Sequence, residues 1–315
     1  MMRRLPHKTK QFFFVLIKLS IVMAAFYFIY DKLTNNGALK FSDFWNYILK
    51  NGVFSTKTII LLTFLSGFNW FFEILKWKVL GSSVEKITLK QAAEQTLGSL
   101  TASLFTPNRI GEYGAKALYF PFGKRKQVMI ANLTGNVLQM MATTVFGVIG
   151  LYFFINSYQL KMFFLKPEGY PFFGFLVIVL LGFLFFFRKK LTLKKFKISK
   201  KQLGFCALLS VIRYFIFSFQ FFVLLQLFGV NLNYFEAMTI ILSMYLLASV
   251  IPSIFVFDVL IKGSVAVFLF LLAGVNEVIV LSVVTIMWVF NFMLPSLLGC
   301  YFVLTFQPKR NTVSA

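Results

Sequence analysis

The sequence is poor in the groups from which most catalytic and metal sites are built. Among 315 residues there are one histidine, His7, and two cysteines, Cys206 and Cys300. A single imidazole excludes a histidine-based triad and a histidine-rich metal cluster. Both cysteines lie in apolar runs, where a lone thiol behaves as a small hydrophobic side chain. We therefore predict no catalytic residues, no metal site and no cofactor.

Charge is scarce and mostly of one sign. Charged residues make up 13% of the chain and hydrophobic residues 59%, whereas roughly a quarter of a soluble domain is charged. This composition excludes a soluble globular protein. The 32 Lys and Arg against 10 Asp and Glu suggest nucleic acid or anionic lipid as a partner. Little of the chain is polar enough for a nucleic-acid-binding domain, so we predict an all-α integral protein of the plasma (inner) membrane.

Long hydrophobic runs divide the chain. A span needs about 20 apolar residues to cross about 30 Å of hydrocarbon, and six runs have that length: 11–30, 57–80, 127–157, 171–187, 203–229 and 278–304. The first follows a basic tail but lacks a cleavage site, which favours an uncleaved span over a signal peptide. We predict one membrane domain over residues 1–315, with about six full spans.

Two further stretches, 88–122 and 234–274, are more polar, and each is interrupted by a proline, Pro107 or Pro252. Each is either a re-entrant hairpin or two short spans. With re-entrant hairpins, 21 cations fall on one side of the membrane and 6 on the other, which makes both termini cytoplasmic. Both alternatives leave the following segments on the same side of the membrane. The cation count therefore supports the orientation of the chain but does not show that the hairpins are re-entrant.

The loop 188–201 carries eight cations in 14 residues. Such a loop is typical of a cytoplasmic topology signal. It also fits attraction to an anionic membrane surface, and both interpretations stay open.

The two proline stretches resemble each other. Glu112 follows Pro107, Asp258 follows Pro252, and a lysine lies four residues after each acid, Lys116 or Lys262. An acid four residues before a lysine is well oriented for a pair on one helix face. Each stretch follows two spans and precedes one, which predicts a first repeat over about 11–157 and a second over about 171–304. Three crossings per repeat invert the second copy, as in many transporters.

Charged side chains at membrane depth need a partner or water. The sequence places five of them near the prolines: Arg109, Glu112, Lys116, Asp258 and Lys262. Non-helical backbone at Pro107 and Pro252 must line a cavity or be buried in protein. We expect the hairpin tips to meet at a wet chamber where Arg109 faces an anion such as a lipid phosphate. The alternative is that the acid–lysine pairs are structural and hold each hairpin closed.

Polar residues also occur within the neighbouring spans. Asn132, Asn136 and Gln139 share one helix face, where they either surround a head group or join helices by hydrogen bonds. Glu73 and Arg213 lie in spans without a repeated partner. We expect those two to snorkel toward the interface or to have a structural role.

The stretch Thr106-Pro107-Asn108-Arg109-Ile110-Gly111-Glu112 resembles the P-x-R-x-G-E signature of the flippase-like membrane domain of lysylphosphatidylglycerol synthases. The resemblance implies a domain that moves a lipid between leaflets. It also implies that Pro107, Arg109, Gly111 and Glu112 are the motif residues. Only nine residues follow Phe306, too few for the aminoacyl-transferase domain of those synthases, so we do not expect lysyl transfer.

These patterns favour a flippase-like transporter of a phospholipid or polyprenyl-linked lipid. Its head-group site would consist of Pro107, Arg109, Gly111, Glu112, Lys116, Pro252, Asp258, Lys262, Asn132, Asn136 and Gln139. One alternative is a membrane enzyme that acts on such lipids, with Glu112 or Asp258 as base. Another is a non-catalytic partner of a separate lipid-modifying enzyme or glycosyltransferase.

Overall fold

The computed structural model describes residues 55–104, 106, 109–159, 198–251 and 258–307, together with Ser20 and Met23. This part of the chain is helical and contains no strand, which confirms the all-α class for it. Its α-helices are α3 (Thr56–Ser82), α4 (Leu89–Ala102), α5 (Gly111–Leu118), α6 (Arg125–Ser157), α8 (Lys200–Leu227), α9 (Tyr234–Val250), α10 (Asp258–Leu272), α11 (Glu277–Trp288) and α12 (Leu294–Thr305). A π-helical segment, Val289–Met293, joins α11 to α12 without a break.

Within the described residues, four helical segments are long and apolar enough to cross a membrane: Thr56–Ser82, Phe122–Ser157, Lys200–Leu227 and Glu277–Thr305. They coincide with four of the six predicted spans. The predicted spans 11–30 and 171–187 lie outside the described residues, except for Ser20 and Met23. The chain is therefore a helical membrane protein.

Local signals account for where the helices begin. Thr88 and Ser199 each accept a hydrogen bond from the backbone of a glutamine three residues later, and that glutamine bonds back to the capping residue. Asn233 and Asn276 cap α9 and α11 in a similar way. The short connections before α9 and α11 each turn at a glycine with positive φ, Gly229 and Gly274.

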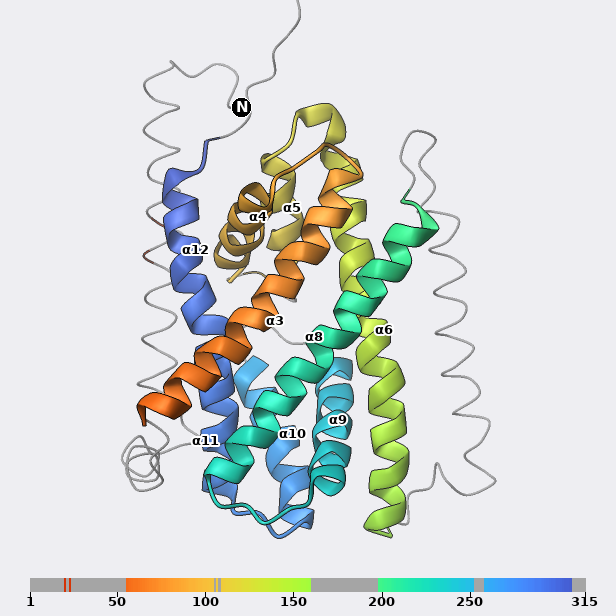
Figure 1. Cartoon of the computed structure of the whole chain (residues 1–315), viewed down its shortest axis with the longest axis vertical. Coiled ribbons are helices and arrows are strands. Elements are labelled where there is room, and N and C mark those ends of the chain that lie inside the picture. The colour runs from red at the N-terminus through yellow and green to blue at the C-terminus, as the bar shows by residue number, and fades with distance from the viewer. Residues whose placement is uncertain are drawn as a thin grey trace, which may run out of the picture.

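Each proline-containing stretch folds as two helices with a break between them. The stretch 88–122 forms α4 and α5, and the stretch 234–274 forms α9 and α10. Figure 1 shows α4 and α5 in the upper half of the molecule and α9 and α10 in the lower half. The two breaks therefore interrupt helices that lie on opposite sides of the molecular centre.

Helix packing in residues 55–159 recurs in residues 198–307. α4 packs against α5 and α12, whereas α9 packs against α10 and α6. α3 contacts α4 and α6, and α8 contacts α9 and α11. α3 and α8 also pack against each other. α3 and α12 end on the side of the molecule where α6 and α8 begin (Figure 1), so α3 and α8 run in opposite directions, and so do α6 and α12.

Glycines bring two corresponding helix pairs into close contact. A Cβ added to Gly150 of α6 would lie 2.6 Å from the Cβ of Leu242 in α9. In α12, a Cβ added to Gly299 would collide with the carbonyl oxygen of Leu97 in α4. Small residues allow helix backbones in membranes to approach closely and pack well. The α4–α12 and α6–α9 contacts therefore both depend on the absence of a side chain.

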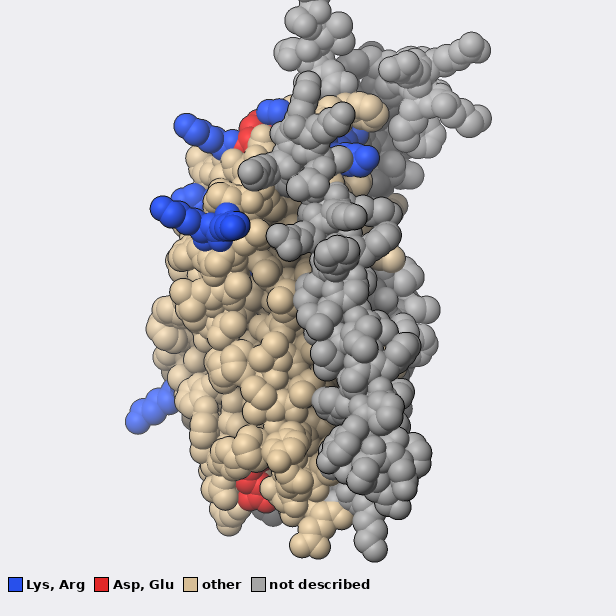
Figure 2. Space-filling view, turned by 90° about the vertical axis from the view of Figure 1, so that its right-hand side faces the viewer, with Lys and Arg blue, Asp and Glu red and all other residues tan. Residues whose placement is uncertain are grey.

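Charges on the described surface gather at the ends of the helices. Figure 2 shows basic side chains concentrated near one end of this face and an almost uncharged surface below them. That end contains the C-terminus of α3 and the N-termini of α4, α6 and α8, with Lys78, Lys86, Lys90, Lys124, Arg125, Lys126, Lys200 and Lys201. Between the ends, α3 exposes aromatic side chains such as Phe64 and Phe71, as expected of a surface that faces lipid.

Candidate cationic cavity

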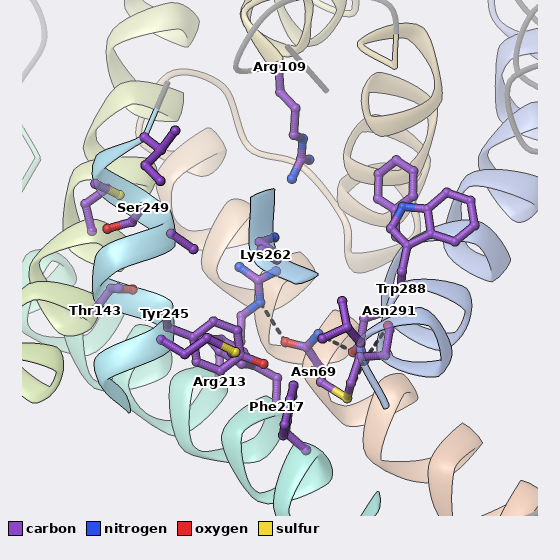
Figure 3. Close-up of a pocket in the computed structure, with 18 of the residues that line it drawn as sticks. Asn69, Arg109, Thr143, Arg213, Phe217, Tyr245, Ser249, Lys262, Trp288 and Asn291 are labelled. Carbon is purple, nitrogen blue, oxygen red and sulfur yellow. Dashed lines mark hydrogen bonds between the residues drawn. The ribbon is translucent and has the colours of Figure 1, made fainter. Parts of the chain in front are cut away.

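A cavity of about 700 Å³ lies between helices of residues 55–159 and helices of residues 198–307. Its lining includes Asn69, Trp70, Arg109, Thr143, Arg213, Phe217, Tyr245, Ser249, Lys262, Trp288 and Asn291 (Figure 3). Arg109 lies just before α5, and Ser249, Val250 and Ile251 lie at the end of α9. The cavity is therefore lined by residues next to both helix breaks.

Three cationic side chains line this cavity. Arg109 comes from the first break, Arg213 from α8 and Lys262 from α10. In Figure 3, Arg109 extends into the cavity toward Lys262 and the guanidinium of Arg213. A charge at the bilayer centre costs about 2.5–3.5 kcal/mol on insertion scales. Three converging cations therefore favour water or an anion in this space.

Arg109 is paired with a buried network of charged side chains. Its Nη2 lies 2.8 Å from Oε2 of Glu112. The other carboxylate oxygen of Glu112 accepts a 2.7 Å hydrogen bond from Nζ of Lys116, which confirms the predicted pair one helical turn apart. Nζ of Lys116 also donates to Oδ1 of Asn132 at 2.7 Å and lies 4.3 Å from the ring centroid of Trp77. The network joins the first break to α6 and α3.

The backbone around Arg109 is held by the residues of the predicted motif. Arg109 has a φ of 56°, a left-handed conformation that costs about 1–3 kcal/mol in a non-glycine residue. Gly111 donates its N–H to Oγ1 of Thr106 at 2.9 Å. A Cβ on Gly111 would lie 2.8 Å from Cγ2 of Thr106. The glycine thus allows the turn that directs Arg109 toward the cavity.

A second ion-pair network joins α3 to α8. Oε2 of Glu73 lies 2.6 Å from Nη1 of Arg213 and 2.7 Å from Nζ of Lys76. Nε of Arg213 donates to Oδ1 of Asn69 at 2.8 Å. Of the two roles expected for Glu73 and Arg213, snorkelling or structural, their ion pair supports the structural one, and Arg213, which also lines the cavity, is only 17% exposed. The 21 cations assigned to the cytoplasmic side from the sequence include Lys76, but this side chain lies buried within α3.

Amide side chains extend the second network toward α11. Nδ2 of Asn69 donates to Oδ1 of Asn291, and Nδ2 of Asn291 donates to Oε1 of Gln220 in α8. Asn291 is the middle residue of the π-helical segment, where Trp70 donates its indole N–H to the carbonyl oxygen of Asn291 at 2.9 Å. π-Helical turns inside α-helices are frequent at functional sites. Sequence patterns missed this residue because a lone asparagine in an apolar run has no periodic signal.

The predicted polar face of α6 lies mostly behind the cavity lining. Asn132 bonds to Lys116, and Nδ2 of Asn136 donates to the hydroxyl of Tyr113 at 2.9 Å. Nε2 of Gln139 donates to the carbonyl oxygen of Ser210 at 3.4 Å. These three amides join α6 to α5 and α8, and none of them lines the cavity. Thr143, one turn beyond Gln139, does line it.

The other predicted site residues are described only in part. Pro107 and Pro252 lie outside the described residues. Asp258 is the first residue of α10, but its side chain is outside the described part. Among the described residues, no three His, Cys, Asp or Glu side chains are grouped so that they could hold a metal ion.

Chemically, the cavity combines fixed positive charge with aromatic and thioether walls. Guanidinium groups match the geometry of phosphate and carboxylate oxygens. The aromatic residues Phe217, Tyr245 and Trp288 supply apolar surface beside them. Such a space suits a ligand with an anionic part and an apolar part. The chain matches no family model, no curated protein and no solved structure.

Proposed function

We propose that this protein is a flippase-like transporter, which moves the anionic or lipid-linked head group of a phospholipid or polyprenyl lipid between leaflets. The observation that carries the proposal is one cavity that lies next to both helix breaks and has Arg109, Arg213 and Lys262 in its lining. Ionisable residues within membrane-spanning segments are candidates for a functional site by default, because they are costly to bury in hydrocarbon. The resemblance of the Arg109 motif to the flippase-like domain of lysylphosphatidylglycerol synthases agrees with this function.

In this proposal the chain is an inverted repeat. α4–α5 and α9–α10 are re-entrant hairpins that enter from opposite sides of the membrane. The paired contacts α4–α12 and α6–α9, and the contact between α3 and α8, support it. Alternating access then arises from rocking of one repeat against the other around a site near the midplane.

The basic end of the molecule is cytoplasmic in this proposal. Eight described cations lie at the end where α4, α6 and α8 begin, whereas the opposite end carries Lys57, Glu236 and Glu277. Cytoplasmic loops of membrane proteins are enriched in Lys and Arg. In this proposal both chain termini are cytoplasmic, and the membrane is the plasma membrane.

Each charged residue then has a defined role. Arg109 binds the phosphate of the head group, and Arg213 and Lys262 add positive charge on the opposite wall of the cavity. Glu112 positions Arg109 and neutralises Lys116. The acyl or prenyl chains stay in the bilayer, because only a small polar group has to enter the cavity.

Transport is testable in reconstituted vesicles that contain trace fluorescent phosphatidylglycerol or phosphatidic acid in both leaflets. A membrane-impermeant reductant reports the lipid that reaches the outer leaflet. We expect Arg109→Ala to slow translocation by about tenfold or more, since a charged hydrogen bond contributes about 1.5–3 kcal/mol.

The matched control is Lys90→Gln, which removes one cation from the exposed basic end. It should translocate lipid at the rate of the unmodified protein. Unchanged translocation of both lipids by a well-folded Arg109→Ala protein would contradict the proposed function.

A further inference from the structure

The interior of the described protein has more cations than acids. Ionisable side chains that are buried or line the cavity comprise the cations Lys76, Arg109, Lys116, Arg213 and Lys262 and the acids Glu73 and Glu112. The excess is three positive charges. Asp258 begins α10, and counting its carboxylate still leaves an excess of two.

Both glutamates are already shared between two cations. Glu112 contacts Arg109 through one oxygen and Lys116 through the other. Glu73 contacts both Arg213 and Lys76 through Oε2. In addition, Nε of Arg109 is buried and has no hydrogen-bond acceptor among the described residues. The side chains of this interior therefore leave positive charge and one donor to be satisfied at the cavity.

We propose that the cavity binds a phosphate group with at least two negative charges, namely a phosphomonoester or a diphosphate, in preference to a phosphodiester. This inference rests on the proposed lipid function and specifies its substrate class. A phosphodiester carries one negative charge, and one charge leaves the interior unbalanced. A monoester carries about −1.5 to −2 near neutral pH. In a low-dielectric interior, each further charge on the ligand strengthens its attraction to three fixed cations.

The shape of the cavity agrees with a lipid as the source of this phosphate. Its volume of about 700 Å³ exceeds what a phosphate group alone fills, and ligand sites of this size usually have mostly apolar walls. Here Phe217, Phe221 and Trp288 provide such walls. The phosphate binds among the cations, and the adjoining apolar part of the lipid packs against these rings.

Binding can be measured with protein in phosphatidylcholine nanodiscs, because Trp70 and Trp288 line the cavity and their fluorescence reports occupancy. The ligands are lysophosphatidic acid, a monoester, and lysophosphatidylglycerol, a diester, with the same acyl chain. We expect the monoester to bind at least about tenfold more tightly. Equal affinity for the two lipids, or tighter binding of the diester, overturns the inference.

Inorganic phosphate and pyrophosphate form the second arm of the titration. Binding of the lipid monoester with negligible effect of millimolar phosphate assigns the site to a lipid. Displacement of the lipid by micromolar pyrophosphate supports the polyanion inference and assigns the site to a soluble diphosphate.

Variants at Lys262 test whether the charge excess causes the preference. Lys262→Gln should weaken monoester binding by about tenfold and diester binding by much less, and Lys262→Arg should retain the preference. Lys90→Gln, which removes an exposed cation, should change neither affinity. An unchanged preference in a folded Lys262→Gln protein overturns the inference, and if that variant fails to fold, the comparison of lipids in the unmodified protein decides.

The outcome is separable from that of the proposed function. Preferential binding of the monoester without translocation of any lipid contradicts transport and leaves the inference intact. Translocation with tighter binding of the diester supports transport and contradicts the inference.

Discussion

The two helix breaks occupy corresponding positions but differ in chemistry. Next to the first break, Arg109, Glu112 and Lys116 form a chain of ion pairs in which Glu112 and Lys116 are buried. Next to the second, the described residues Val250 and Ile251 are apolar, and the nearest described cation is Lys262 of α10. Corresponding helix packing therefore supports two different surfaces on one cavity. The described residues next to the first break form several ion pairs. The described part of α9 and α10 contributes one cation, Lys262, to the lining of the cavity.

The two breaks therefore contribute different features to the cavity. The first break holds a guanidinium in a defined place through contacts with α3, α5 and α6. The described wall from α9 and α10 adds mainly apolar surface to the cavity. Substitutions should therefore have unequal effects on stability at the two breaks.

The largest effect should follow the loss of the acid at the first break. Glu112→Ala leaves Arg109 and Lys116 without their shared carboxylate in a buried site. We expect a loss of about 3–5 kcal/mol in the free energy of unfolding, as for other broken buried ion pairs. Unfolding of the detergent-solubilised protein, followed by helical circular dichroism, measures this loss.

The comparison variant in the second stretch is Lys262→Ala, which removes a cation from an interior that has more cations than acids. We expect it to cost less than half as much, because it leaves no buried cation without its carboxylate. The double variant Glu112→Ala/Lys116→Met should regain part of the stability, because it removes one of the two uncompensated cations. Equal losses for Glu112→Ala and Lys262→Ala would remove the proposed difference between the breaks.

An intermediate effect should follow from filling the glycine contacts. Gly299→Ala forces α12 away from the carbonyl oxygen of Leu97, and Gly150→Ala forces α6 away from Leu242. Overpacking of this kind costs about 1–3 kcal/mol. Because the two contacts correspond, we expect losses of similar size in the same unfolding measurement.

Gly114 provides the control for the glycine series, since a Cβ added there meets no atom within 4 Å. Gly114→Ala should keep or slightly increase stability. A large loss for Gly299→Ala with none for Gly150→Ala would mean that the two helix contacts are not equivalent.

The smallest effect should come from the amides behind the cavity. Asn136→Ala removes one hydrogen bond between α6 and α5. Side-chain hydrogen bonds between membrane helices contribute about 0.6 kcal/mol on average, so the unfolding free energy should fall by about that amount. Monoester affinity should stay unchanged, because Asn136 does not line the cavity. A large loss of affinity would instead place this amide in the ligand site.

Several features of the fold and of the site could be predicted from the sequence. Apolar runs predicted the four described spans, because hydrocarbon requires long apolar helices with every backbone group bonded internally. The prolines marked the two breaks, because proline cannot donate an intrahelical hydrogen bond. The Glu112–Lys116 pair was also predictable, since residues four apart on a helix are neighbours whatever the rest of the fold does.

The tertiary structure alone decided which distant polar residues meet. Arg213 and Glu73 are 140 positions apart in the chain, and Asn69 and Asn291 are 222 apart. No periodic pattern connects such residues, because their contact depends on where α3 crosses α8 and the π-helical segment Val289–Met293. The packing of helices also brings Arg109, Arg213 and Lys262, which are far apart in the chain, to one cavity. The sequence by itself determined a helical membrane protein with two interrupted helix pairs, and packing of those helices decided which of its charges share a site.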